Sequence, residues 1–313
     1  MKTLLYTNFD FPGLTKFYRG KVRDIYIVEN RVFIMIVTDR ISAFDVILDK
    51  GVPFKGQVLN ELASFFLDMT SDIVPNWKIT KAHPRVIIGE KCEPLPIEII
   101  VRGYIAGSAW RAYKQGKRVI SGVKFPENLR ENQKLPYPVI TPTTKAEHGH
   151  DIEISKQEII DSGLVQKHIY EQIEKYALEL FNRGSQYANS RGLILVDTKY
   201  EFGLCNGEIM LIDEVHTPDS SRYFYLSDYQ EKFEAGQKPK HLSKEFVRQW
   251  LIANNFMGEK NQSMPYISDD VIDEISARYI ELYEVLTAKK FQKVNDTPEQ
   301  IYNSIMTYLK NIL

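Results

Sequence analysis

The chain has few cysteines and no long apolar run, and these absences exclude several classes of protein. Only two cysteines, Cys92 and Cys205, occur among 313 residues, and their spacing is not that of a metal site. A disulfide framework is therefore not indicated, and we expect a reducing, cytoplasmic location. No apolar stretch approaches the length that spans a bilayer. The N-terminus also lacks the basic segment and apolar core of a signal peptide.

Neither sign of charge predominates in the chain. The 40 basic and 41 acidic residues give a net charge of -1 at pH 7, so neither nucleic acid nor a membrane is indicated as a partner. The six histidines form no metal-ligand spacing such as HxxxH. We expect a globular chain, a monomer or small homo-oligomer, whose length favours two lobes over one core.

Strand patterns dominate the first hundred residues, and helix patterns dominate the second half. The patterns predict a β-hairpin of 22–28 with 31–38, a helix at 60–69, strands at 86–88 and 97–101, a loop-rich segment at 115–150, and helices at 155–162, 166–191, 243–255, 269–288 and 297–313. This order predicts an α+β fold with a small β-rich lobe at 1–112 and a second lobe at 113–313. Ligands commonly bind in the cleft between such lobes.

The most informative stretch is an apolar run that suddenly carries charge, LILVDTKYEFG at 193–203. Side chains two apart on a strand point to the same face, so Asp197, Lys199 and Glu201 should form one row. A second apolar run ends in Asp213. Buried carboxylates need a cation or donor, and a magnesium ion that carries a nucleotide phosphate is the natural candidate for Glu201 and Asp213.

The turn between these two runs decides whether Asp213 can join that row. A three-residue loop at 205–207 would place Asp213 opposite Lys199, with Glu201 as its diagonal neighbour. A strict two-residue turn would place Ile212 opposite Glu201 and turn Asp213 to the wrong face. We predict the three-residue loop.

Two further motifs suit anions. Gly20, Lys21 and Arg23 form a basic turn in which backbone N–H groups could approach a phosphate, although such a turn alone is weak evidence. Arg102 at a strand end is followed by Gly107 and Ser108, and these could bind a phosphate or carboxylate. If Ser108 caps a helix at 109–114, the helix N-terminus would add its positive end to the same site. An ordinary capped helix after a solvent-facing arginine fits the local sequence equally well.

The loop after Asp213 is polar throughout. Asp219, Ser220 and Arg222 follow the strand-borne carboxylates and predict the rim of a site. His216 could act as a base, but a structural role is the more common one for a loop histidine.

Together these segments resemble the SAICAR synthetase family. The segments at 193–203 and 95–108 look like its two signature segments. GKVRDIY at 20–26, TDRISAFD at 38–45, DEVHTPDSSRY at 213–223 and KEFVRQWL at 244–251 also fit. The length and the insertion TPTTKA at 141–146 look like the longer form found in yeast.

The resemblance implies a carbon–nitrogen ligase of purine biosynthesis. Such an enzyme joins L-aspartate to 5-amino-1-(5-phosphoribosyl)imidazole-4-carboxylate through an acyl phosphate and uses ATP and Mg²⁺. The implied fold is a kinase-like small lobe and an ATP-grasp-like second lobe.

The resemblance also implies roles for individual residues. Gly20, Lys21 and Arg23 would meet ATP, Glu201 and Asp213 would hold the metal, and Lys199, Asp197, Asp219 and Asp45 would act at the reacting groups. Ser42, Arg102, Gly107, Ser108, Ser220, Arg222, Lys244 and Arg248 would bind substrate. Lys145 and His150 are weaker candidates, and the segment 93–98 would receive adenine through its backbone.

Two alternatives remain at this level. Asp-x-Lys followed by glycine also resembles inositol polyphosphate kinases, which would need only a polyol as acceptor. A nucleotide-binding regulator would keep the basic turn but would have no use for three alternating charges on a strand.

Overall fold

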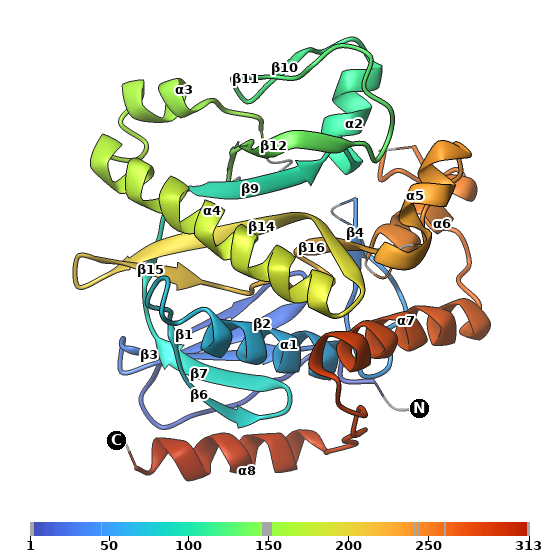
Figure 1. The fold of residues 1–313 in the computed structure, drawn as a ribbon. Helices are drawn as coiled ribbons and strands as arrows, with labels where there is room; N and C mark the ends of the chain where they lie inside the picture. Colours follow the sequence, from blue (N-terminus) through green and yellow to red (C-terminus); the bar gives the residue numbers. More distant parts are fainter. Residues whose placement is uncertain are drawn as a thin grey trace.

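Two antiparallel sheets form the frame of the molecule (Figure 1). The computed structural model describes residues 3–44, 46–145, 152–240, 242, 244–259 and 261–311. The smaller sheet has the order β1 (Leu14–Arg19), β2 (Arg23–Val28), β3 (Val32–Val37), β7 (Val86–Glu90) and β6 (Lys78–His83). Its predicted hairpin, β2 with β3, is confirmed.

The larger sheet has seven strands, and β14 is its centre. Its main path is β12 (Lys134–Ile140), β9 (Ile97–Tyr104), β14 (Leu193–Cys205) and β15 (Glu208–Ile212), while β8 (Glu93–Pro94), β13 (Thr143–Thr144) and β16 (Ser221–Tyr225) pair at its sides. Two short ladders, β4 (Ser42–Ala43) with β5 (Val46–Ile47) and β10 (Val119–Ile120) with β11 (Val123–Lys124), complete the strands.

Eight helices of the described residues surround these sheets. They are α1 (Lys55–Met69), α2 (Gly107–Lys114), α3 (Lys156–Asp161), α4 (Lys167–Ser190), α5 (Leu226–Glu234), α6 (Glu245–Ala253), α7 (Asp269–Thr287) and α8 (Pro298–Leu309). The predicted α+β architecture with two lobes is confirmed. The predicted helix limits at Ser243 and Leu313 lie outside the described residues.

Strand β3 is apolar throughout because both of its faces are covered. Val32, Ile34 and Ile36 pack toward α8, whereas Met35 and Val37 belong to the main core on the opposite face. Alternate side chains of a strand point to opposite faces, so a doubly covered strand reads as a continuous apolar run.

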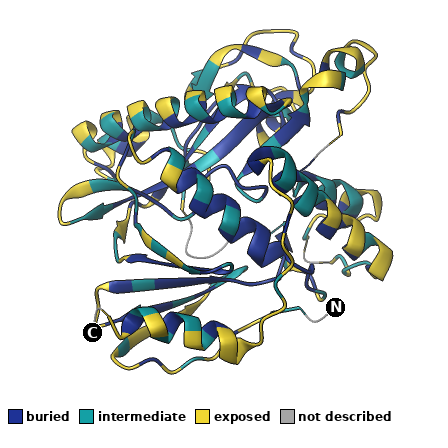
Figure 2. Cartoon of the chain, turned by 60° about the horizontal axis from the view of Figure 1, so that its bottom comes forward, coloured by how far each residue is buried: buried dark blue, intermediate teal, exposed yellow. Residues whose placement is uncertain are grey.

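One apolar core continues from the small sheet to the large one. It includes Met35 of β3, Leu62 of α1, Leu282 of α7, Tyr200 of β14 and Leu180 of α4. Helix α4 packs across β14 and β9. Burial is concentrated on the strands and on the inward helix faces, and the outward faces are exposed (Figure 2). The change from one sheet to the other falls between β7 and β8, whereas the division of the chain at residue 112 stays a prediction.

The predicted three-residue loop in the charged hairpin is wrong. Glu201 pairs with Ile212 and Cys205 with Glu208, which leaves a two-residue turn at Asn206 and Gly207. Both turn residues have positive φ, 50° and 85°, as a type I′ turn requires. The preference of Asn-Gly for a two-residue turn therefore sets the hairpin, although this turn does not place Asp213 opposite Lys199 in the ladder.

Three further sequence-based predictions change. Helix α2 begins at Gly107 with Ala106 as its N-cap, so Ser108 lies in the first turn and does not cap the helix. Strands β1, β6 and β16 and helix α5 are among the elements that were not predicted, and the loop-rich segment contains strands β10 to β13, of which β12 has seven residues. Within the described residues, no helix is long and apolar enough to cross a membrane.

Candidate active site

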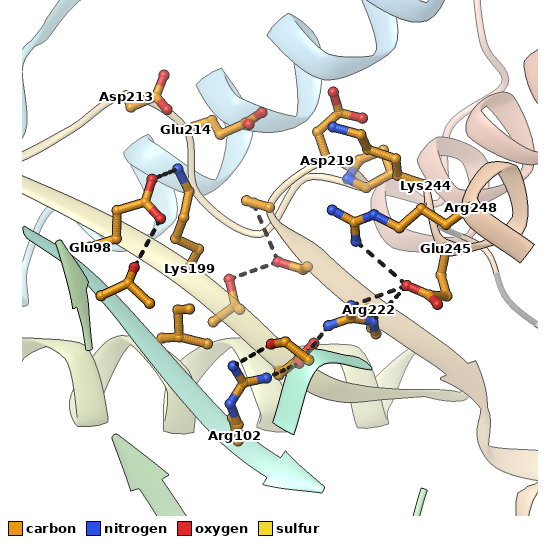
Figure 3. A pocket seen from close by; sticks show the side chains of 18 of the residues that line it. Glu98, Arg102, Lys199, Asp213, Glu214, Asp219, Arg222, Lys244, Glu245 and Arg248 are labelled. Carbon is orange, nitrogen blue, oxygen red and sulfur yellow. Dashed lines mark hydrogen bonds and ion pairs between the residues drawn. The ribbon is translucent and has the colours of Figure 1, made fainter. Parts of the chain in front are cut away.

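The row of charge on β14 lines two adjoining cavities, as the predicted common face requires: Asp197 and Lys199 line one cavity, and Lys199 and Glu201 line the other. Figure 3 shows Lys199 in the first of these cavities. Lys199 donates to Glu98 of β9 at 2.6 Å and also to Glu201. Lys145 donates to the other oxygen of Glu201. Burial alone would raise the pKa of Glu201, but these two ammonium groups together hold it well below its usual range. A carboxylate and two lysines thus share the second cavity.

Asp213 reaches the same two cavities by a change of backbone direction at its own position. It follows the last ladder residue of β15 and has a left-handed φ of 64°. Arg23 pairs with Asp213 and with Glu214, both at 2.7 Å. Burial raises the pKa of Asp213 to about 6, and the charges of Glu201 and Glu214 add to this rise. The left-handed conformation of Asp213 therefore brings its carboxylate into these cavities, which was the expected effect of the three-residue loop.

A second group of charges surrounds Asp197 at the far end of the row. Arg102 lies opposite Asp197 in the β9–β14 ladder and donates to it at 3.0 Å. Arg222 donates to the same oxygen at 2.7 Å. Arg102 also donates to the hydroxyl of Ser108 at 3.2 Å. Burial lowers the pKa of Arg102 to about 10. Arg222 and Arg248 also share the carboxylate of Glu245, so three arginines here meet two carboxylates, and the excess positive charge suits an anion.

Gly107 allows one of these arginines to approach. Its φ is 57°, and a Cβ at this position would lie 2.2 Å from a guanidinium nitrogen of Arg222. Any side chain here would displace Arg222. On its other side, Arg222 donates to Glu245 of α6 at 3.1 Å, and Arg248 shares that carboxylate (Figure 3).

A buried ion pair supports the remaining wall. Lys55, the first residue of α1, donates to Asp219 at 2.9 Å and is fully buried. Tyr279 of α7 donates to the other oxygen of Asp219 at 2.6 Å. Burial opposes ionisation of Asp219, but the charges of Lys55 and Lys244 hold its pKa well below its usual range. Burial lowers the pKa of Lys244 to about 8.

These groups line two cavities that share a wall. The first, of about 540 Å³, is strongly charged and contains Arg102, Arg222 and Asp219. The second, of about 610 Å³, lies against the small sheet and is largely apolar, with Ile25, Phe33 and Met35. Residues that line both cavities are Lys21, Val22, Arg23, Lys199 and Asp213.

The structure brings nearly all predicted site residues to these cavities. The charged cavity is lined by Lys21, Arg23, Ser42, Arg102, Ser108, Asp197, Lys199, Asp213, Asp219, Ser220, Arg222, Lys244 and Arg248. The apolar cavity is lined by Gly20, Lys21, Arg23, Lys145, Lys199, Glu201 and Asp213. Gly107 contacts the site only through Arg222, and the predicted residues Asp45 and His150 lie outside the described residues.

Sequence analysis missed three contributors. Glu98 was assigned to a segment where only the backbone was expected to matter, yet its side chain binds Lys199. A glutamate inside the apolar strand β9 was the available signal. Lys55 gave no local signal, because its partner Asp219 lies 164 positions away in the chain. For Glu245 the available signal was Arg248, three residues later on the same helix, whereas its partner Arg222 lies in another element.

His216 is a structural residue. It is fully buried, its Nε2 lies 2.6 Å from the hydroxyl of Tyr200, and its ring packs against Gly184. Burial lowers its pKa to about 3, so it stays neutral. The alternative role as a base at the rim of the site is therefore wrong.

The carboxylates of Glu201 and Asp213 are each paired with basic side chains, Glu201 with two lysines and Asp213 with Arg23. Both line the apolar cavity, Asp213 also lines the charged one, and burial destabilises the charge of Asp213. In the part of the chain that the structure describes, no group of three or more His, Cys, Asp or Glu residues could hold a metal alone. Two carboxylates suffice for Mg²⁺, which usually takes its other ligands from phosphates and water.

A charged cavity beside an apolar one, with lysine, arginine and carboxylates between them, is the kind of site that suits an enzyme of phosphorylated substrates. Residues 16–265 match the model of the SAICAR synthetase family. The chain belongs to this family, whose members are ATP-using ligases.

Curated relatives and solved structures agree with this assignment. A phosphoribosylaminoimidazole-succinocarboxamide synthase from Bacteroides fragilis is 55% identical over 312 residues, 99% of each chain. One from Cytophaga hutchinsonii is 52% identical and covers 100% of this chain and 99% of its own. The SAICAR synthase from Saccharomyces cerevisiae complexed with SAICAR has a TM-score of 0.77 at 35% identity, over 91% of this chain and 99% of that one.

A further solved structure, a SAICAR synthetase (Type-2) in complex with ADP, has a TM-score of 0.68 at 25% identity, over 88% of this chain and 100% of that one. The predicted resemblance to this family is confirmed. The kinase alternative receives no support from these matches.

Proposed function

We propose that this chain joins L-aspartate to the carboxylate of 5-amino-1-(5-phosphoribosyl)imidazole-4-carboxylate and converts ATP to ADP and phosphate. The observation that carries the proposal is the shared wall of the two cavities, where Lys21, Arg23, Lys199 and Asp213 face both. A nucleotide in the apolar cavity would direct its terminal phosphate toward this wall. A carboxylate in the charged cavity would meet it there.

The chemistry requires two steps. The carboxylate oxygen attacks the terminal phosphorus of ATP, so that a new P–O bond forms and the bond to ADP breaks. The aspartate ammonium then gives a proton to water and its amine attacks the acyl carbon. The C–O bond to phosphate breaks, phosphate leaves, and the nitrogen releases its second proton to give the amide. Positioning and charge neutralisation are the main tasks of the protein in such a reaction.

The charges of the site divide between these tasks. Arg102, Ser108 and Arg222 would bind the phosphate of the ribonucleotide, since rigid guanidinium groups match phosphate oxygens. Lys199 would neutralise charge on the transferred phosphoryl group, and Asp197 would orient the two arginines that bind it. Ser42 and the segment near it would border the aspartate.

The nucleotide half of the site rests on the basic turn and the apolar cavity. Lys21 and Arg23 would neutralise the ATP phosphates, and Gly20 would let the backbone approach them. Glu201 and Asp213 would hold Mg²⁺, which when bound supplies further positive charge to these phosphates. The cytoplasmic location and the oligomeric state stay predictions.

An isotope experiment tests the proposal directly. The ribonucleotide is prepared with ¹⁸O in its carboxylate and turned over with ATP and L-aspartate. We expect one ¹⁸O in each released phosphate, because the acyl oxygen leaves with phosphorus. ADP release should require both substrates. Phosphate without ¹⁸O would refute the acyl phosphate, and ADP release with a polyol alone would support the kinase.

A further inference from the structure

The two cysteines of the chain, 113 positions apart in sequence, lie on neighbouring strands. β8 pairs antiparallel with β14, with Pro94 opposite Gly203 and Glu93 opposite Leu204. One step further along this register, Cys92 lies opposite Cys205. Each thiol also influences the pKa of the other, which requires that they lie in each other's immediate surroundings.

The type of strand position favours a bond between them. The N–H of Leu95 donates to the carbonyl of Phe202 at 2.8 Å, which makes this pair a hydrogen-bonded one. Hydrogen-bonded and non-hydrogen-bonded pairs alternate in an antiparallel ladder, so Cys92 and Cys205 fall on a non-hydrogen-bonded position. Side chains are closest there, with Cα atoms about 4.5 Å apart, within the range of disulfides.

The location of the pair connects it to the apolar cavity. Cys92 follows β7 of the small sheet, precedes β8 of the large sheet and lines the cavity. Cys205 ends β14 and donates to Glu90 at 3.0 Å, and Glu90 lines the same cavity. A bond between the thiols would tie the crossover between the sheets to the β14–β15 hairpin.

We propose that Cys92 and Cys205 form a reversible disulfide that restricts the apolar cavity and weakens nucleotide binding. The oxidant is a small-molecule disulfide such as oxidised glutathione. The Cys205 thiolate attacks it, a mixed disulfide forms and one glutathione thiol leaves. The Cys92 thiolate then attacks the Cys205 sulfur, the protein disulfide forms and the second glutathione thiol leaves.

The surroundings set the rate of this exchange. Burial raises the pKa of Cys92 to about 12, and the hydrogen bond to Glu90 raises that of Cys205. Thiolates are the reactive form, so the exchange is slow at neutral pH and accelerates as pH rises. The disulfide therefore forms under sustained oxidation and not during a brief exposure to the oxidant.

The first experiment detects the bond without any assay of activity. The full-length protein is incubated with oxidised glutathione at pH 8.5 and analysed by mass spectrometry, intact and after proteolysis without reduction. We expect the intact mass to fall by two hydrogens and a linked peptide that contains both cysteines, and dithiothreitol should reverse both. Separate glutathione adducts, intermolecular links or unchanged thiols would overturn the proposal.

The second experiment measures the consequence for nucleotide binding, and this part rests on the proposed function. The oxidised protein should show a KM for ATP raised about 10-fold, as expected when groups that position a substrate shift. The matched control is Cys205→Ser, whose KM should not change after the same treatment. A disulfide without a change in this KM would overturn the link to the nucleotide. Activity of the reduced protein tests the proposed function separately.

Discussion

Replacement of Lys55 by methionine should destabilise the protein strongly, although Lys55 was not a predicted site residue. Its ammonium group is fully buried and Asp219 is 5% exposed. Removal of one partner from a buried ion pair costs about 3–5 kcal/mol, because the remaining charge is left without compensation. Tyr279 would still donate to Asp219, and Lys244 lies nearby, so we expect the lower part of this range.

Urea unfolding at pH 7, followed by circular dichroism, measures this loss. The double variant Lys55→Met with Asp219→Asn should cost less than the sum of the single variants by about 1–3 kcal/mol, because no charge is then stranded. Lys81→Met is the matched control. Its pair with Glu61 is partly exposed, so we expect a loss below about 1 kcal/mol. A loss below about 1 kcal/mol in Lys55→Met would contradict the assigned cost of a stranded buried charge. Additive losses in the double variant would contradict it as well.

Three further predictions concern the site. Asp213→Asn should lower kcat about 100-fold or more in steady-state kinetics, since one preorganised charge is lost; wild-type rates would remove its assigned role. Arg222→Ala should raise the KM for the ribonucleotide about 10-fold or more and change the KM for ATP little. Because burial lowers the pKa of Lys244 from 10.5 to about 8, the unfolded chain binds more protons between these values, and stability should rise with pH across that window by at most about 3 kcal/mol. In urea unfolding at several pH values, Lys244→Met should lack this rise.

The two-residue period of the strand patterns predicted a large part of the site. Alternation along β14 predicted correctly that Asp197, Lys199 and Glu201 share a face, because a strand allows only two directions for its side chains. Arg102 was expected at a strand end, but it lies inside β9, which continues to Tyr104. The shared face depends on neighbours in the sequence, and local patterns can predict it.

The features that sequence analysis missed depend on distant partners or on one backbone angle. Asp213 enters the cavities through its left-handed φ, which no pattern of apolar residues encodes. Lys55 is buried against Asp219, which comes from a distant part of the chain, and α7 brings Tyr279 to the same carboxylate. Ser108 looked like a helix cap, but α2 begins one residue earlier at a glycine that Arg222 needs for its own approach. In each case tertiary contacts outweigh local preference.

The continuous core limits how the chain can be divided. Helix α1 lies in the first quarter of the sequence and packs against α7, which lies near the end of the sequence. Both helices contribute to the apolar cluster that also contains residues of β3 and β14. A fragment that ends at residue 112 would leave one side of α1 in water, and the complementary fragment would expose α7. Expressed separately, the two fragments should aggregate, whereas co-expression should recover a folded complex. The intact protein should melt in a single calorimetric transition.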